Sequence, residues 1–369
     1  MSKKKIKIFG AALDPTDSEK KIAIKINYLN NLKRNRGTKH NEYRDSYMGF
    51  IEESSVLKNS KFQKVGRFPV ETWLRTKPDT EDMIFMNPLE FRTFLDTNGC
   101  REYSDKMKQF IERKILPDIP LMIGADHSLT GGVLRALSEL YGRENITVII
   151  FDGHFDAIPT DLRLNLAKYS MEHKDEIQAI FPEFLDSVSK DTEVPSTYNC
   201  GTFLYYLLED EIILPQNLIL YGVMDYPDET LNDIDDFRVK NYVNFYKKFE
   251  EKGAKFIPND KDYEKMNRSF EEIISSINTP YIYLSVDVDV GSLNAVLAAR
   301  FMDFIGVDEN CLINLSKIIG NFLKSRETTI IGMDIMEIEI FFINAQLKSG
   351  KTDKTVNIME NYLELLLID

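Results

Sequence analysis

Residues 147–157 read Thr-Val-Ile-Ile-Phe-Asp-Gly-His-Phe-Asp-Ala. The first five side chains are β-branched or aromatic, which is typical of a buried strand. Polar groups follow at Asp152, His154 and Asp156. Because side chains alternate along a strand, these three are expected to point to the same side. Such a group is costly at the end of a buried strand unless something neutralises it, and a divalent cation would do so directly.

Two further strand ends carry similar groups. Residues 281–290 read Tyr-Ile-Tyr-Leu-Ser-Val-Asp-Val-Asp-Val, with Asp287 and Asp289 at the end of an apolar run. Residues 121–128 read Leu-Met-Ile-Gly-Ala-Asp-His-Ser, which puts His127 in a Gly-containing turn after a strand. In open α/β sheets, ligands collect at the carboxyl ends of the strands. We therefore expect the three strand ends to form one site.

Short apolar runs recur along the chain with helix-like segments between them, which is typical of a parallel sheet covered by helices. The strand candidates are residues 5–9, 120–123, 147–151, 217–223, 281–286 and 328–333. The helix candidates are residues 103–115, 130–141, 200–210, 268–277 and 308–324. With no repeat or linker to mark a boundary, the chain is expected to form a single three-layer α/β/α domain over residues 1–369, with a mostly parallel central sheet.

Two segments, residues 30–80 and 160–198, fit this rhythm poorly. The second directly follows the richest motif. Long segments at strand carboxyl ends often serve as lids, so we expect a lid or specificity insertion at 160–198.

The composition narrows the class of partner. Lys+Arg 46 against Asp+Glu 59 gives a formal net charge of -13, which argues against nucleic acid or an anionic membrane. No apolar stretch approaches the length of a membrane helix. Three widely spaced cysteines, Cys100, Cys200 and Cys311, suggest no disulfide framework, so the expected compartment is the reducing cytoplasm.

The donor set narrows the class of metal. Taken singly, a buried histidine is often satisfied within a core and an Asp pair often forms a turn, but the combination favours a site. Oxygen-rich ligation with one imidazole per ion suits Mn²⁺, with Fe²⁺, Co²⁺, Ni²⁺ and Zn²⁺ left open. Bridging carboxylates would hold two ions at roughly 3.5 Å, where a shared water becomes a nucleophilic hydroxide. His40 and His173 lack this context and are expected on the surface.

The motifs resemble those of the ureohydrolases, the family of arginase, agmatinase and formiminoglutamase. The family signatures Gly-Gly-Asp-His-Ser, Asp-Ala-His-x-Asp and Ser-x-Asp-x-Asp match residues 124–128, 152–156 and 285–289 in the same order. The resemblance covers about residues 120–340 and implies an arginase-like fold with two Mn²⁺ ions. The implied ligands are His127 and Asp156 on one ion, His154 and Asp289 on the other, and Asp152 and Asp287 as bridges.

A fourth match implies a substrate. Residues 332–337, Gly-Met-Asp-Ile-Met-Glu, resemble the family strand whose glutamate faces the substrate guanidinium. The resemblance therefore implies that Glu337 grips a small guanidino or amidino substrate, and that Glu337 and Asp156 are catalytic. The implied reaction is attack of metal-bound hydroxide on an arginine-like compound to give urea and an amine. A formimino compound or arginine within a peptide stays open as the substrate, and a homo-oligomer is expected because relatives commonly form trimers or hexamers.

Two departures from the family pattern bear on activity. Cys200, in Asn-Cys-Gly-Thr-Phe at 199–203, stands where the family has a proton-shuttle histidine. A neutral thiol shuttles protons poorly at pH 7, so Cys200 is catalytic, or another group such as His173 replaces it, or Cys200 is a small buried hydrophobe. The loop after Asp289 is also rebuilt, and Arg300 on it either binds a substrate carboxylate or forms a surface ion pair.

Two other functions remain open. A metal-binding protein without hydrolase activity is favoured by Cys200 and opposed by the complete set of acidic ligands. A single-zinc deacetylase of the related fold would need fewer ligands than this chain carries.

Overall fold

A central parallel sheet organises the molecule. The structure, a computed structural model, describes residues 4–16, 18–34, 43–173, 195–302 and 304–368. Within them lies one sheet of eight strands in the order β2-β1-β3-β8-β7-β4-β5-β6, with every neighbouring pair parallel. The strands are β1 (Ile6–Ala11), β2 (Phe62–Arg67), β3 (Ile119–Gly124), β4 (Ile146–Phe151), β5 (Leu218–Val223), β6 (Lys255–Pro258), β7 (Tyr281–Asp287) and β8 (Thr329–Met336).

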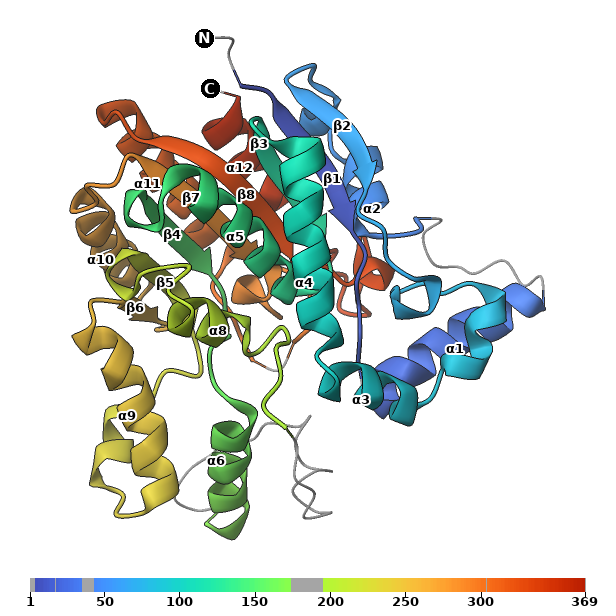
Figure 1. The fold of residues 1–369 in the computed structure, drawn as a ribbon, viewed down its shortest axis with the longest axis horizontal. Helices are drawn as coiled ribbons and strands as arrows, with labels where there is room; N and C mark the ends of the chain where they lie inside the picture. Colours follow the sequence, from blue (N-terminus) through green and yellow to red (C-terminus); the bar gives the residue numbers. More distant parts are fainter. Residues whose placement is uncertain (1–3, 17, 35–42, 174–194, 303, 369) are drawn as a thin grey trace.

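Helices cover both faces of this sheet (Figure 1). Side chains of α4, α5, α8 and α9 join one hydrophobic core, and those of α2, α10, α11 and α12 join a second core on the other face. The predicted three-layer α/β/α architecture is therefore confirmed. The helices are α1 (Glu19–Lys33), α2 (Ser46–Glu53), α3 (Pro88–Asp96), α4 (Gly99–Phe110), α5 (Thr130–Tyr141), α6 (Thr160–Glu172), α8 (Phe203–Glu209), α9 (Phe237–Glu251), α10 (Tyr263–Ser275), α11 (Glu309–Ser325) and α12 (Thr355–Leu367).

Strand β4 shows how the sequence divides the two cores. All six of its residues are buried. Val148 and Ile150 belong to one core, while Ile149 and Phe151 belong to the other. A parallel strand buried on both faces reads as a continuous apolar run, which is the pattern that predicted β4.

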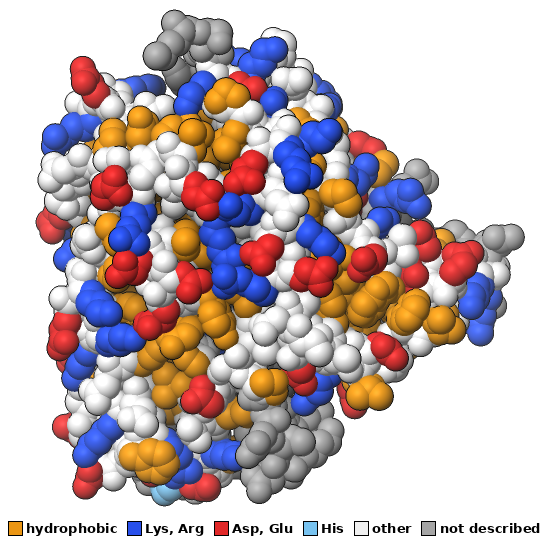
Figure 2. Space-filling view, in the orientation of Figure 1, with side chains coloured by type: hydrophobic (Ala, Val, Ile, Leu, Met, Phe, Trp, Pro, Cys, Tyr) orange, Lys and Arg blue, Asp and Glu red, His pale blue; other side chains and the backbone are white. Residues whose placement is uncertain are grey.

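All carboxyl ends of the strands meet at one edge, because the strands are parallel. Strands β3, β8, β7 and β4 are consecutive in the middle of the sheet, so the loops that follow them gather at the centre of that edge. Acidic and basic side chains are interspersed with apolar ones over the face of the molecule seen in Figure 2. No helix of the described residues is both long and apolar enough to cross a membrane.

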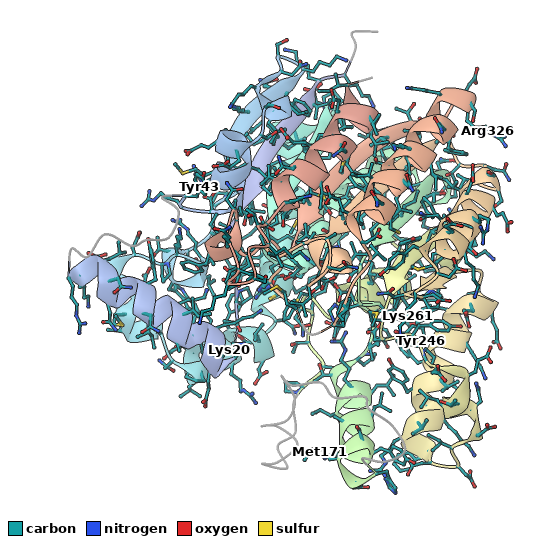
Figure 3. The ribbon with its side chains drawn as sticks, turned by 180° about the vertical axis from the view of Figure 1, so that it is seen from behind. Lys20, Tyr43, Met171, Tyr246, Lys261 and Arg326 are labelled. Carbon is teal, nitrogen blue, oxygen red and sulfur yellow. The ribbon has the colours of Figure 1, made fainter. Side chains whose placement is uncertain are left out.

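The expected insertion at 160–198 is described only in part. Its first thirteen residues form α6, which projects away from the sheet, with Met171 near the tip (Figures 1 and 3). Residues 174–194 lie outside the described residues.

Candidate metal centre

The loop after β4 carries three of the predicted ligands, but not by strand alternation. Strand β4 ends at Phe151, and residues 152–156 form an irregular turn. The His154 N–H donates to Asp152 Oδ1 at 2.6 Å, and Asp156 adopts a left-handed φ of 53°. The expectation that an extended backbone aligns these side chains is therefore wrong, because the turn brings them together.

The loop after β7 is tied to the same turn. Asp287 ends β7, and Asp289 lies in a single helical turn that follows. Asp287 Oδ1 accepts the Asp289 N–H at 2.9 Å, and Asp289 Oδ1 accepts the Gly153 N–H at 3.0 Å. The first bond orders the loop after β7, and the second fixes it against the loop after β4.

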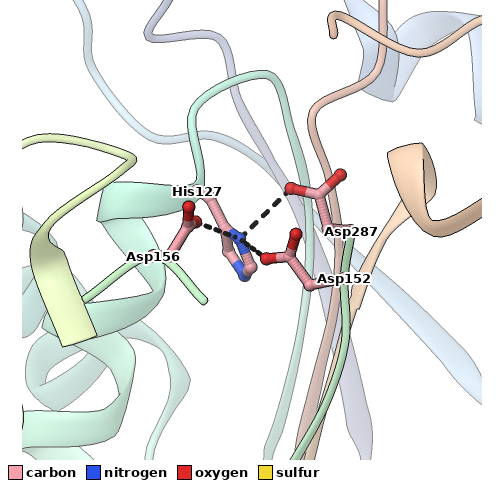
Figure 4. A group of neighbouring side chains, drawn as sticks. All are labelled: His127, Asp152, Asp156 and Asp287. Atoms are coloured by element: carbon pink, nitrogen blue, oxygen red, sulfur yellow. Dashed lines mark ion pairs between the residues drawn. The ribbon is translucent and has the colours of Figure 1, made fainter. Parts of the chain in front are cut away.

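Four side chains surround the first candidate position (Figure 4). His127 Nδ1 lies 3.2 Å from Asp152 Oδ2, 3.0 Å from Asp156 Oδ2 and 3.2 Å from Asp287 Oδ2. All four residues are buried. Three carboxylates thus converge on one imidazole nitrogen.

The second candidate position adjoins the first. His154 Nδ1 lies 3.0 Å from Asp289 Oδ2 and 3.6 Å from Asp152 Oδ1. Asp152 belongs to both groups, whereas Asp287 belongs only to the group that contains His127. The six residues singled out in the sequence therefore lie together in two groups that share one carboxylate.

These residues fit divalent cations. Within the described chain, three buried atoms here have no hydrogen-bond partner: His127 Nδ1, Asp152 Oδ2 and Asp289 Oδ2. Burial, followed by the charge of Asp152, raises the pKa of Asp156 to about 7, and burial with the neighbouring carboxylates raises that of Asp287. Carboxylates gathered in this way repel one another unless a cation lies among them. Two imidazoles and four carboxylates suit a hard or borderline divalent ion rather than a soft ion that prefers thiolate ligands.

Glu337 and Arg300 lie directly beside the first group. Glu337 follows β8 with a left-handed φ of 58°, and its Oε1 accepts the His127 N–H at 3.0 Å. Its Oε2 lies 3.3 Å from an Arg300 guanidinium nitrogen. That guanidinium also pairs with Asp14 at 2.9 Å and Asp126 at 3.2 Å. Arg300 is therefore buried in an ion network, and the alternative of a surface ion pair is wrong.

A protein-family model described as "Arginase family" matches residues 53–353. The chain belongs to the Arginase family. No curated protein sequence matches it.

Solved structures of the same fold are distant in sequence. An arginase from Bacillus caldovelox is 15% identical, with a TM-score of 0.54 and 98% of each chain covered. Proclavaminate amidino hydrolase from Streptomyces clavuligerus is 14% identical, with a TM-score of 0.53, covering 99% of this chain and 90% of that one. Formimidoylglutamase from Bacillus subtilis is 16% identical, with a TM-score of 0.53, covering 100% and 87%. At these identities the likeness shows the fold alone.

In this family member, side chains of β7 and β8 form a hydrogen-bond chain on the Nε2 side of the His127 ring. His127 Nε2 lies 2.8 Å from Ser285 Oγ, which donates to Asp334 Oδ1 at 2.5 Å. Thr130 donates to the other oxygen of Asp334 at 2.7 Å. Such outer contacts orient a metal-binding imidazole. Sequence reasoning gave Asp334 no role, although Ser285 and Asp334 are direct neighbours in the β7–β8 register.

The two candidate proton shuttles lie in different places. The Cys200 thiol is grouped with the carboxylates of Asp126 and Glu337. Burial and then these two carboxylates raise the pKa of Cys200, so the thiol is neutral at pH 7. His173 follows the far end of α6, where its ring stacks on Tyr169 at 4.3 Å. His40 lies outside the described residues.

Proposed function

We propose that this chain is a binuclear-metal amidinohydrolase that hydrolyses a guanidino compound to urea and an amine, with manganese as the metal. The observation that carries the proposal is the pair of largely buried His/Asp groups that share Asp152. Three of their polar atoms have no hydrogen-bond partner among the described residues. Four carboxylates in so small a volume are expected only where cations neutralise them. The family membership supports the same reading.

Each site residue has a role in this proposal. His127 and Asp156 would hold one ion, His154 and Asp289 would hold the other, and Asp152 and Asp287 would contribute to both. When bound, two such ions supply Lewis acidity and bring the pKa of a water near neutrality.

The remaining roles belong to protein groups near the ions. Asp156 accepts a proton from the attacking water, and Glu337 holds the guanidinium through its carboxylate. Arg300 acts in substrate binding by fixing Glu337, because three carboxylates and the carbonyls of Pro15 and Ala125 already occupy its donors. Cys200 contributes a neutral thiol to the wall of the same site.

The activities named for three structural neighbours support a linear amidine as the substrate. These neighbours are an arginase, an amidino hydrolase and a formimidoylglutamase. A formimino compound or a peptide arginine is thus a variant of the same proposal. We also infer one domain with a specificity insertion at 160–198, a homo-oligomer and a cytoplasmic location, which the three free cysteines favour.

A second candidate is a metal-binding homologue without hydrolase activity. The Arg300–Glu337 pair favours it, because a resident guanidinium already neutralises the carboxylate that would receive the substrate. The neutral Cys200 thiol points the same way, since it is a poor proton shuttle.

The first test combines metal content with product release. We expect elemental analysis to find about two metal ions per chain after incubation with Mn²⁺, and urea to appear from at least one compound in a panel of guanidino acids and amines. Two ions without urea from any free or peptide-bound guanidino compound, and without formamide from formimino compounds, would favour the non-hydrolytic homologue. Fewer than one ion per chain would contradict both candidates.

A further inference from the structure

Lys21 is a half-buried residue near the candidate metal centre, and none of the roles proposed above involves it. It lies in the first turn of α1, the helix that follows β1 in the chain. Figure 3 marks its neighbour Lys20 at the end of α1 nearer the body of the molecule. The Lys21 Nζ is buried and has no hydrogen-bond partner in the described chain. Among the described residues, the centre of the Phe301 ring lies 3.7 Å from this Nζ.

The same helix contains a second lysine with a buried ammonium group, and this group is fully partnered. Lys25, one turn later, is buried, and its Nζ donates to the carbonyls of Asp14 at 2.8 Å and Arg75 at 2.7 Å. It also pairs with Asp14 Oδ2 at 3.1 Å. A buried ammonium without such partners costs free energy, so Lys21 differs from a residue kept for stability.

Three carboxylates act on the charge of Lys21, and two of them, Asp14 and Glu337, are already paired with other cations. The third, Glu339, accepts the Phe341 N–H at 3.3 Å. Asp14 pairs with Lys25 and Arg300, while Glu337 accepts from Arg300 and from the His127 N–H. Arg300 repels the Lys21 ammonium and, after burial, is the next cause that lowers the pKa of Lys21. An incoming anion would therefore find an available cation at Lys21 and not at Arg300.

The position of Lys21 suits a ligand that also reaches the metals. The Phe301 ring lies 3.7 Å from Lys21 Nζ and 6.2 Å from the ring centre of His154, so Nζ is within about 10 Å of that imidazole. Lys21 also stands at the amino end of α1, where the helix dipole favours negative charge. A molecule the size of an amino acid is long enough to place one end at Lys21 and the other at the candidate metal centre.

We propose that Lys21 binds the carboxylate of the substrate, so that this site selects guanidino acids over guanidino amines. This inference rests on the proposed function for the guanidino end of the substrate. Lys21 is then a specificity-determining residue, and the residues at the metals carry out the same chemistry on whatever it admits.

The test uses compounds matched in every group except the carboxylate. Binding to the Mn²⁺-loaded full chain is measured by calorimetry for arginine and agmatine, and for 4-guanidinobutyrate and propylguanidine. We expect the wild type to bind the acid of at least one pair roughly 10-fold or more tighter than its partner. Lys21→Met should remove this preference, Lys21→Arg should retain part of it, and Lys20→Met, on the exposed side of the same turn, should leave it unchanged.

Equal binding of acid and amine, a preference that survives in Lys21→Met, or no binding of any of the four compounds would overturn the proposal. Urea is measured in the same samples. Urea without a Lys21-dependent preference would leave the hydrolase and remove the role of Lys21. A Lys21-dependent preference without urea would support the role of Lys21 in carboxylate binding and contradict the hydrolase.

Discussion

At the residue scale, Gly153 allows a close approach of the Phe304 ring that an alanine, the residue in the family signature, would block. The signature has alanine at this position, and a Cβ added to Gly153 would lie 1.9 Å from the Phe304 ring. That ring packs edge-on against His154 with centroids 5.2 Å apart. Glycine therefore makes room for an aromatic side chain that supports one of the candidate ligands.

Gly153→Ala should consequently weaken metal binding. The added methyl group must displace Phe304, which removes support from His154, and losses of this kind are typically 10- to 100-fold in metal affinity. Calorimetric titration with Mn²⁺ would measure the change at the weaker of two sites. Adding Phe304→Leu to Gly153→Ala should recover part of the affinity, because the shorter side chain relieves the clash. Unchanged Mn²⁺ affinity in the single variant would show that Phe304 does not support the ligand.

At the scale of elements, Arg300 joins loops from three strands. Its partners are Asp14 after β1, Asp126 after β3 and Glu337 after β8. Backbone bonds hold the Arg300 loop in place, since the Arg300 N–H donates to the Glu337 carbonyl at 2.7 Å. The guanidinium is buried, so solvent screens these pairs little.

Arg300→Met should therefore destabilise the protein strongly. Removing the cation leaves buried carboxylates without it, which typically costs about 3–5 kcal/mol. Urea denaturation monitored by circular dichroism would give the free energy of unfolding. Arg268→Met is a suitable control, because Arg268 is largely exposed and its loss should change stability by about 0.5 kcal/mol or less. A loss of under about 1 kcal/mol in Arg300→Met would contradict the network as a source of stability.

The elements also show what the sequence could predict. The six predicted strands correspond to β1, β3, β4, β5, β7 and β8, while β2 and β6 were missed. The two missed strands are the sheet edges. Edge strands are short or polar, and β2 exposes Gln63 and Lys64 while β6 has only four residues. Their sequences therefore lack the apolar run that identifies a strand buried on both faces.

At the scale of the whole molecule, some parts of the candidate site could be predicted from the sequence and others could not. His127, Asp152 and Asp287 could be found from sequence because each stands in a short motif at a strand end. The contacts of Arg300 and Lys21 could not, because their partners come from loops far apart in the chain and meet only once the sheet has formed. Local patterns report strand ends, whereas an ion network depends on the order of strands in the sheet.

The whole fold should respond to metal, since the six candidate ligands come from loops after three strands of one sheet. An ion that binds only the folded state at 100 times its Kd adds about 2.7 kcal/mol of stability. Thermal unfolding should therefore shift to higher temperature with Mn²⁺ and return with a chelator. Asp152→Asn should lose most of this shift, measured against its own midpoint in chelator, because Asp152 belongs to both groups. Asp233→Asn, at an exposed position, should keep it. If Asp152→Asn and Asp233→Asn gained equally from Mn²⁺, the ion would be binding elsewhere, and the site drawn from these six residues would have to be abandoned.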